Sequence, residues 1–299
     1  MPIDVTPLQE NFGAEVTGVD FTKPVDGESM ARIEAIFTRY AVLVFPDQPI
    51  NDEQQIALTR QFGPLESNPG YAGGKMFRRE EVADFTNVAD DDSLMRAEDP
   101  RRNFNIANQL WHTDSSFKHI PAKCSLLSAR EISPAGGQTE FADLRSAYEA
   151  LPENRKQELE GLVAEHSIFH SRSQIGFGAF NKEIHQQFPP VNQMIVRRHP
   201  GSGKKTLYLA AHASHVVGWP IEQGRGLIRE LIDFATQPQF VYRHRWRVAD
   251  LVLWDNRCTM HRGRPYDDSR YRRVMHNTKA ADIANTVDQE NALQNLHSI

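Results

Sequence analysis

The segment Trp111-His112-Thr113-Asp114-Ser115-Ser116 places an imidazole and a carboxylate one residue apart. If this segment is extended, His112 and Asp114 point to the same face, because side chains alternate along a strand with a period of two. A His-x-Asp pair alone is a weak signal, since so short a pattern often arises by chance. Its interpretation therefore rests on what the remainder of the chain supplies.

Residues 251–262 (LVLWDNRCTMHR) supply a second imidazole at His261. With His112 and Asp114 it would form a facial triad of two histidines and one carboxylate. Such a set covers one side of an octahedral ion and leaves the other open for a co-substrate and O2, as non-haem Fe(II) oxygenases require. A lone histidine in a strand is more often a satisfied structural residue. In that case loss of His112 would destabilise the fold, whereas a metal ligand could be lost with the fold intact.

The composition indicates an ordinary soluble protein of 299 residues, 39% hydrophobic and 24% charged. A formal net charge of -5 argues against a general nucleic-acid binder. We find neither an apolar run of bilayer length nor a signal-peptide core after Met1. The cysteines, Cys124 and Cys258, are too few for a disulfide framework. We therefore expect a cytoplasmic protein with no membrane or nucleic-acid partner.

Hydrophobic patterning predicts a mainly β protein with flanking helices. Helices are expected after the caps Asp26, Asn51 and Asp143, and over residues 152–162 and 222–236. Strands are expected over residues 41–45, 124–130, 139–141, 193–199, 206–210, 240–248, 251–255 and 272–278. Many short strands with turn signals and few helices favour a double-stranded β-helix, the jelly roll.

We expect one domain over residues 1–299, because the chain shows neither an internal repeat nor a low-complexity linker. Within it, residues 1–65 would form N-terminal helices and strands packed on the jelly roll. Residues 66–108 are rich in glycine and acidic residues without periodicity, which indicates a long loop that could act as a lid. Residues 283–299 are expected to be a polar tail.

Further motifs follow the His-x-Asp pair in a fixed order. They are Gly136-Gly137-Gln138-Thr139, Trp254-Asp255-Asn256-Arg257 with His261, and Arg272-Arg273-Val274-Met275. The ordered set resembles the TauD/TfdA family of Fe(II)- and 2-oxoglutarate-dependent dioxygenases. Residues 62–66 (FGPLE), 108–112 (NQLWH), 137–143 (GQTEFAD), 211–215 (AHASH) and 242–246 (YRHRW) are similar to its TfdA branch, which comprises aryloxyalkanoate dioxygenases. The resemblance covers most of residues 5–280.

This resemblance implies that His112, Asp114 and His261 hold Fe(II). It also implies that Arg273 pairs with the far carboxylate of 2-oxoglutarate, a role that suits the guanidinium fork.

Thr139 would be the hydroxyl partner of that carboxylate, and Trp254 would lie beside the co-substrate. Two alternatives stay open. Trp254 is as easily a core aromatic, and a one-residue slip of the strand would turn Arg272 inward in place of Arg273.

The substrate pocket departs from the family pattern. Arg273 and Asn277, four residues apart on a strand, should share a face. Related enzymes often carry an anion-binding arginine at the second position, and TfdA-branch enzymes carry lysines before the His-x-Asp pair, where this chain has Tyr71 and Ser93. The candidates for holding the substrate are Tyr71, Lys75, His199, His215 and Asn277. Each of these residue types is more often structural or solvated.

The activity that the resemblance implies is oxidative. 2-Oxoglutarate and O2 would be consumed to give succinate and CO2, and a 2,4-dichlorophenoxyacetate-like substrate would be hydroxylated next to its ether oxygen, which releases a phenol and glyoxylate. The partner would be a small anionic aromatic molecule, and family members are usually homo-oligomers. The alternatives are a taurine, alkyl-sulfonate or alkyl-sulfate dioxygenase with the same iron chemistry, and a non-catalytic jelly roll that holds an ion such as Zn²⁺.

Overall fold

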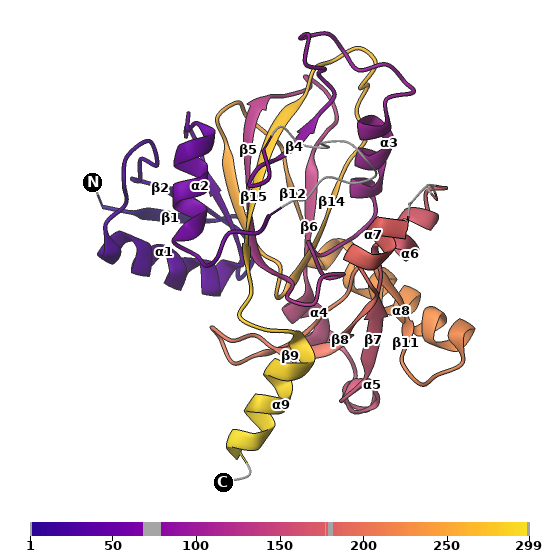
Figure 1. Ribbon diagram of the computed structural model, residues 1–299. Helices are drawn as coiled ribbons and strands as arrows, with labels where there is room; N and C mark the ends of the chain where they lie inside the picture. Colours follow the sequence, from indigo (N-terminus) through magenta and orange to yellow (C-terminus); the bar gives the residue numbers. More distant parts are fainter. Residues whose placement is uncertain (1, 68–78, 177, 179–181, 298–299) are drawn as a thin grey trace.

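The computed structural model describes residues 2–67, 79–176, 178 and 182–297, and its architecture is mainly β with flanking helices, as predicted (Figure 1). Its largest sheet has seven strands. In sheet order they are β1 (Asp4–Pro7), β2 (Ala14–Thr17), β3 (Val42–Phe45), β13 (Leu251–Asp255), β5 (Ala122–Glu131), β15 (Val274–Ala281) and β4 (Ala83–Thr86). β2 and β3 run parallel, and the other neighbours in this sheet are antiparallel.

Three smaller sheets complete the β structure of the described residues. The first joins β12 (Val241–His244), β6 (Thr139–Asp143) and β14 (Thr259–Gly263). The second joins β11 (Ala213–Val216), β7 (Val163–His166) and β8 (Val191–Met194), and the third pairs β10 (Lys205–Leu207) with β9 (Val196–Arg198).

The helices surround these sheets (Figure 1). Those of the described chain are α1 (Gly27–Tyr40), α2 (Asp52–Arg60), α3 (Pro100–Ile106), α4 (Leu144–Ala150), α5 (Glu153–Leu159), α6 (Ile168–Ser173), α7 (Lys182–Gln187), α8 (Ile221–Ala235) and α9 (Thr286–His297), with short 3₁₀ turns at Ala107–Gln109 and Pro238–Phe240. The three predicted caps are confirmed, because the side chains of Asp26, Asn51 and Asp143 accept hydrogen bonds from backbone N–H groups of the first turn.

The strand period divides the core between two faces of the large sheet. Val42 and Val44 of β3 pack with Trp254 of β13 and Phe141 of β6, in the layer between the large sheet and the β12–β6–β14 sheet. Leu43 and Phe45 point the other way and pack in the cluster that contains the buried residues of α1. Figure 1 shows α1 and α2 together on that side of the sheet. The apolar layer between the two sheets is where the candidate site lies.

Two expectations about irregular segments are corrected. The stretch 66–108 is not a continuous loop, because β4 and α3 lie within it and β4 pairs with the edge of β15. Both elements are short and lack a clear apolar period, so patterning cannot reveal them.

The stretch 283–299 is not a simple polar tail, because it contains α9. The hydroxyl of Thr286 donates to Gln193 Oε1 at 2.6 Å and accepts from the backbone N–H of Met194 at 2.8 Å. Polar contacts such as these anchor the start of the helix, and a search for hydrophobic periodicity in the sequence cannot detect them.

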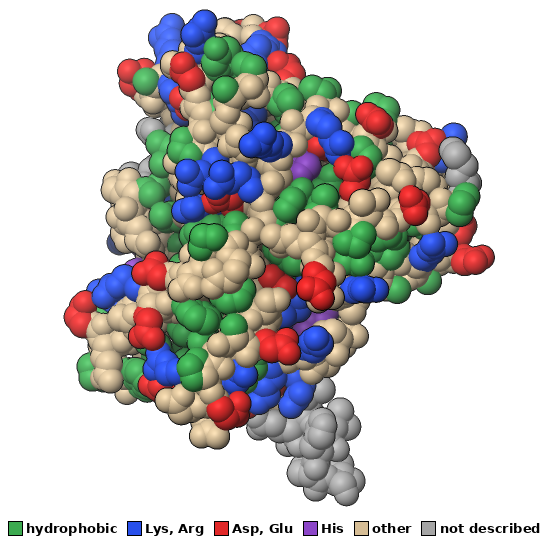
Figure 2. Space-filling model, turned by 180° about the vertical axis from the view of Figure 1, so that it is seen from behind, with side chains coloured by type: hydrophobic (Ala, Val, Ile, Leu, Met, Phe, Trp, Pro, Cys, Tyr) green, Lys and Arg blue, Asp and Glu red, His purple; other side chains and the backbone are tan. Residues whose placement is uncertain are grey.

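The surface mixes both signs of charge. Figure 2 shows Lys and Arg side chains interspersed with Asp and Glu and with apolar side chains on the face opposite that of Figure 1. Across the residues that the structure describes, we find no helix both long and apolar enough to span a membrane.

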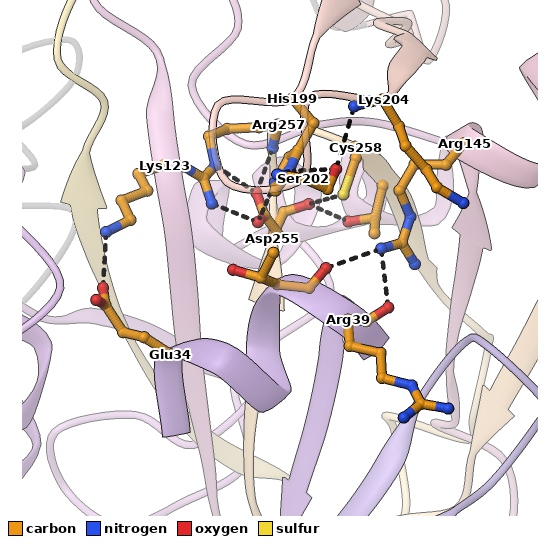
Figure 3. Close-up of polar contacts among 12 residues, drawn as sticks. Glu34, Arg39, Lys123, Arg145, His199, Ser202, Lys204, Asp255, Arg257 and Cys258 are labelled. Carbon is orange, nitrogen blue, oxygen red and sulfur yellow. Dashed lines mark hydrogen bonds and ion pairs between the residues drawn. The ribbon is translucent and has the colours of Figure 1, made fainter. Parts of the chain in front are cut away.

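A buried charged cluster closes the turn between β13 and β14 (Figure 3). Asp255 has no exposed surface, and its carboxylate accepts from Arg257 Nε at 2.8 Å and contacts His199 Nε2 at 2.9 Å. Burial alone would raise the pKa of Asp255, but the charges of Arg257 and His199 hold it well below its usual value. The turn is thus held by the buried carboxylate of Asp255, whose negative charge is balanced by Arg257.

We expect Asp255→Asn to destabilise the protein by about 3 kcal/mol, because it leaves the buried Arg257 without its counter-charge. The free energy of unfolding from urea titration measures this loss. Glu34→Gln is the matched control, since Glu34 is half exposed and meets Lys123 at 3.2 Å, and it should cost less than about 1 kcal/mol. Equal losses for the two variants would contradict this assignment.

Candidate active site

Two reciprocal backbone hydrogen bonds bring the predicted histidines together. The N–H of His112 donates to the carbonyl of His261 at 3.0 Å, and the N–H of His261 donates to the carbonyl of His112 at 2.8 Å. Residues paired in this way place their side chains on one face. The two imidazole centroids are accordingly 4.2 Å apart.

Asp114 completes the cluster, as its position two residues after His112 predicts. Its Oδ1 lies 3.8 Å from His112 Nε2, and its Oδ2 lies 3.8 Å from His261 Nε2. The Nδ1 of His112 faces the carbonyl of Leu110 at 2.7 Å, so its Nε2 is free to bind a metal. One donor atom from each residue lies within 4.8 Å of the others, which fits a single ion.

The protonation states also suit a metal. Burial lowers the pKa of His112, and it lowers the pKa of His261 to about 3, so both imidazoles are neutral near pH 7. Burial would raise the pKa of Asp114, but His261 and Lys279 reverse this and the net shift is downward. Neutral imidazoles and an ionised carboxylate are the forms that ligate metals.

A closed ring of hydrogen bonds orients the carboxylate of Asp114. Ser125 Oγ donates to Asp114 Oδ2 at 2.6 Å, and Asn256 Nδ2 donates to Ser125 Oγ at 2.8 Å. Asn256 Oδ1 in turn accepts from the backbone N–H of Asp114 at 3.2 Å and from Trp254 Nε1 at 3.0 Å. Ser125 and Asn256 are fully buried, so the ring fixes the side-chain rotamer of Asp114.

Thr139 and Trp254 lie beside the histidines. Thr139 pairs with Gly263 in the same two strands in which Phe141 pairs with His261, so Thr139 and His261 share a face. The hydroxyl of Thr139 accepts from Trp246 Nε1 at 3.0 Å. The ring of Trp254 is 4.7 Å from that of His261. Trp254 is therefore both part of the core and a wall of the site.

The two adjacent arginines point in different directions. Arg272 makes ion pairs with Glu131 at 2.8 Å and Asp92 at 2.6 Å on the surface. Arg273 lies against Gly137, where a Cβ atom would come within 3.3 Å of its Nε. Burial lowers the pKa of Arg273, and no carboxylate of the described residues lies within ion-pairing distance of it. The guanidinium of Arg273 could therefore receive an external carboxylate.

Arg273 also borders a cavity of about 560 Å³. The other residues that line it are Phe85, Thr86, Ala97, Arg102, Asn105, Ile106, Asn108, Gln109, Gly263, Arg264, Tyr266 and Asp268. Arg102 there forms an ion pair with Asp268.

The structure separates the five substrate candidates. Tyr71 and Lys75 lie outside the described residues. His199 belongs to the Asp255 cluster, and His215 is half-buried beside Ser214 and Glu165, so neither joins the triad. Of the three candidates that the structure describes, Asn277 is the one on the inner face of β15, where it is buried.

A second group with metal-ligand residue types, His199, Asp255 and Cys258, is chemically less suitable. Asp255 is already paired with Arg257, and burial raises the pKa of the Cys258 thiol, which disfavours the thiolate that binds metals. Sequence reasoning assigned no role to Ser125, which donates to Asp114 Oδ2 at 2.6 Å, or to Lys279, which is paired with Ser125 between β15 and β5. Alternation within residues 124–130 would have placed Ser125 on the inner face, but only strand pairing identifies its partner.

Comparison with known proteins identifies the family. The family model "Taurine catabolism dioxygenase TauD, TfdA family" matches residues 4–278, and the chain belongs to this family.

It is 44% identical to the alpha-ketoglutarate-dependent 2,4-dichlorophenoxyacetate dioxygenase of Cupriavidus pinatubonensis, over 94% of this chain and 99% of that protein. It is 38% identical to the (S)-phenoxypropionate/alpha-ketoglutarate-dioxygenase of Sphingobium herbicidovorans, over 94% and 96%. The crystal structure of AAD-2 in complex with Mn(II) and N-oxalylglycine superposes with a TM-score of 0.87 and 44% identity, covering 96% of this chain and 99% of that chain.

We predict that Ser125→Ala weakens metal binding about 10-fold or more, because Asp114 loses the hydrogen bond that orients its carboxylate. Calorimetric titration of Mn(II) into the metal-free protein measures this affinity. Ser128→Ala is the matched control on the same strand, since its hydroxyl donates to Gln55 on the opposite face at 2.7 Å. A metal affinity equally reduced in both variants would count against the orienting role of Ser125.

Proposed function

We propose that this protein is an Fe(II)- and 2-oxoglutarate-dependent dioxygenase that hydroxylates an aryloxyalkanoate at the carbon next to the ether oxygen. The observation that carries the proposal is the cluster of His112, Asp114 and His261, together with Arg273, whose guanidinium has no carboxylate partner among the described residues. The named substrates of the similar proteins from Cupriavidus and Sphingobium support the choice of an aryloxy acid. A non-catalytic metal site would give Arg273 no purpose.

Each group of the site has a role in this reaction. His112, Asp114 and His261 would hold the ion through one face, which leaves the opposite face for ligands. Arg273 would bind the far carboxylate of 2-oxoglutarate, and Thr139 would donate its hydroxyl proton to the same group. The wall formed by Trp254 and Phe141 would exclude water from this side of the ion.

Iron and 2-oxoglutarate supply the oxidising chemistry with O2, and the protein orients the substrate so that the C–H bond next to the ether oxygen faces the ion. The hydroxylated carbon is then a hemiacetal. Its collapse releases the phenol, and the acetate portion becomes glyoxylate. Succinate and CO2 are the remaining products.

We further propose that the fold is a single double-stranded β-helix. The large sheet and the β12–β6–β14 sheet enclose one apolar layer, to which β3, β5, β6, β13 and β15 all contribute buried side chains. The helices α1 and α2 pack outside this layer.

The proposal predicts O2 uptake and loss of 2-oxoglutarate when Fe(II) and phenoxyacetates are added, with release of the phenol. If only taurine or an alkyl sulfate stimulated O2 uptake, the assignment of iron chemistry would stand, but the assigned substrate class would be wrong. If bound iron produced no turnover of 2-oxoglutarate with any of these substrates, the dioxygenase assignment would be wrong.

Two variants test the co-substrate site in the same assay. Arg273→Leu should raise the 2-oxoglutarate concentration for half-maximal rate by about 10- to 100-fold, because a charge-assisted bond is lost. Arg272→Leu, which removes only surface ion pairs, is the matched control and should change it little.

A further inference from the structure

The inner face of β15 carries a lysine close to the candidate metal ligands. His276 and Thr278 point outward to α2 and its N-terminus, where His276 Nδ1 meets Asp52 at 2.6 Å and Thr278 Oγ1 meets Thr59 Oγ1 at 2.6 Å. Because side chains alternate along a strand, Asn277 and Lys279 point to the opposite face. That is the face on which the triad lies.

Strand pairing places Lys279 beside the carboxylate of Asp114. Lys279 is the direct partner of Ser125 in the β15–β5 pair, and directly paired side chains have Cβ atoms about 5 Å apart on one face. Ser125 Oγ donates to Asp114 Oδ2. Consistent with this position, the positive charge of Lys279 contributes to lowering the pKa of Asp114 and of both triad histidines.

The charge of Lys279 is only loosely compensated. Its side chain is 11% exposed, and the ion pair that it makes with the described residues is to Glu66 Oε2, at 3.8 Å. The same oxygen already accepts from Lys118 Nζ at 2.7 Å and from Ser115 Oγ at 2.8 Å. Two lysines therefore share one carboxylate. When an ion takes up the charge of Asp114, one ammonium group remains in excess.

Two buried acceptors nearby show that the surrounding space is polar. Asn277 Oδ1 and Glu66 Oε1 are buried without a hydrogen-bond partner in the described parts of the chain. Asn277 Nδ2 donates to the carbonyl of Leu126 at 3.3 Å, so Oδ1 is directed away from that carbonyl. Buried polar atoms are normally satisfied by protein, water or ligand. Water or a bound polar molecule is therefore expected here.

We propose that Lys279 binds the carboxylate of the substrate and so determines the preference for acids. This assignment rests on the proposed aryloxyalkanoate dioxygenase function. Asn277 is neutral and offers the site an acceptor, and the ammonium of Lys118 is held by Glu66. Among the described residues, Lys279 is the cation of this cluster whose contact with a carboxylate is long, at 3.8 Å, so its ammonium group has donors to offer a ligand.

The test is calorimetric titration of phenoxyacetate and of its neutral analogue phenoxyacetamide into protein loaded with Mn(II) and N-oxalylglycine. Wild type should bind the acid more tightly than the amide. Lys279→Met should lose about 10- to 100-fold in affinity for the acid and less than about 3-fold for the amide. Lys279→Arg should retain most of the preference.

Controls separate this role from a structural one. Lys123→Met removes the same charge from an ion pair with Glu34 on the neighbouring strand β5, and it should leave both affinities unchanged. The affinity of Lys279→Met for Mn(II) and N-oxalylglycine reports whether its site is intact. If Lys279→Met loses acid and amide equally, or if only Lys118→Met abolishes the preference, the assignment is overturned. If wild type binds Mn(II) and N-oxalylglycine but neither phenoxy ligand, the proposed substrate class is itself wrong.

Discussion

The paired backbone hydrogen bonds between His112 and His261 are the constraint on which the rest of the site depends. They join a segment that follows α3 to a strand near the end of the chain, and they set both imidazoles on one face. Because backbone geometry fixes the distance between them, Asp114, two residues from His112, is brought close enough to both imidazoles to share one ion with them.

Buried polar groups then make this arrangement rigid. Asn256 and Ser125 orient Asp114, and the Asp255–Arg257–His199 cluster holds the turn from which Asn256 projects (Figure 3). Burying any one of these polar or charged groups alone would destabilise the fold, and the hydrogen bonds and ion pairs to its partners offset that cost. These buried hydrogen bonds and ion pairs therefore position the side chains of the site. The apolar layer around Phe141 and Trp254 provides most of the cohesion between the two sheets. The positive charges of Arg273 and Lys279 are the exceptions, because the described residues give Arg273 no carboxylate partner and give Lys279 only a long contact with Glu66, at 3.8 Å.

Much of this organisation could be predicted from the sequence. The caps at Asp26, Asn51 and Asp143 fix the starts of helices through local hydrogen bonds, and short apolar runs such as residues 42–45 mark strands. α9 could not be predicted, because polar contacts to distant residues anchor it. The position of His199 was equally hidden, since its partner Asp255 is remote in sequence. The roles of Ser125 and Lys279 could not be predicted from the sequence. Both residues lie near Asp114 because of how the strands pair, and the spacing of motifs along the chain carries no information about strand pairing.

The central claim is that His112, Asp114 and His261 bind the metal. Anomalous diffraction at the iron edge, from crystals grown anaerobically with Fe(II), tests it directly. The account predicts a single peak about 2.0–2.2 Å from the Nε2 atoms of His112 and His261 and from a carboxylate oxygen of Asp114. A peak at His199, Asp255 and Cys258 instead, or iron bound only at the surface, would contradict it.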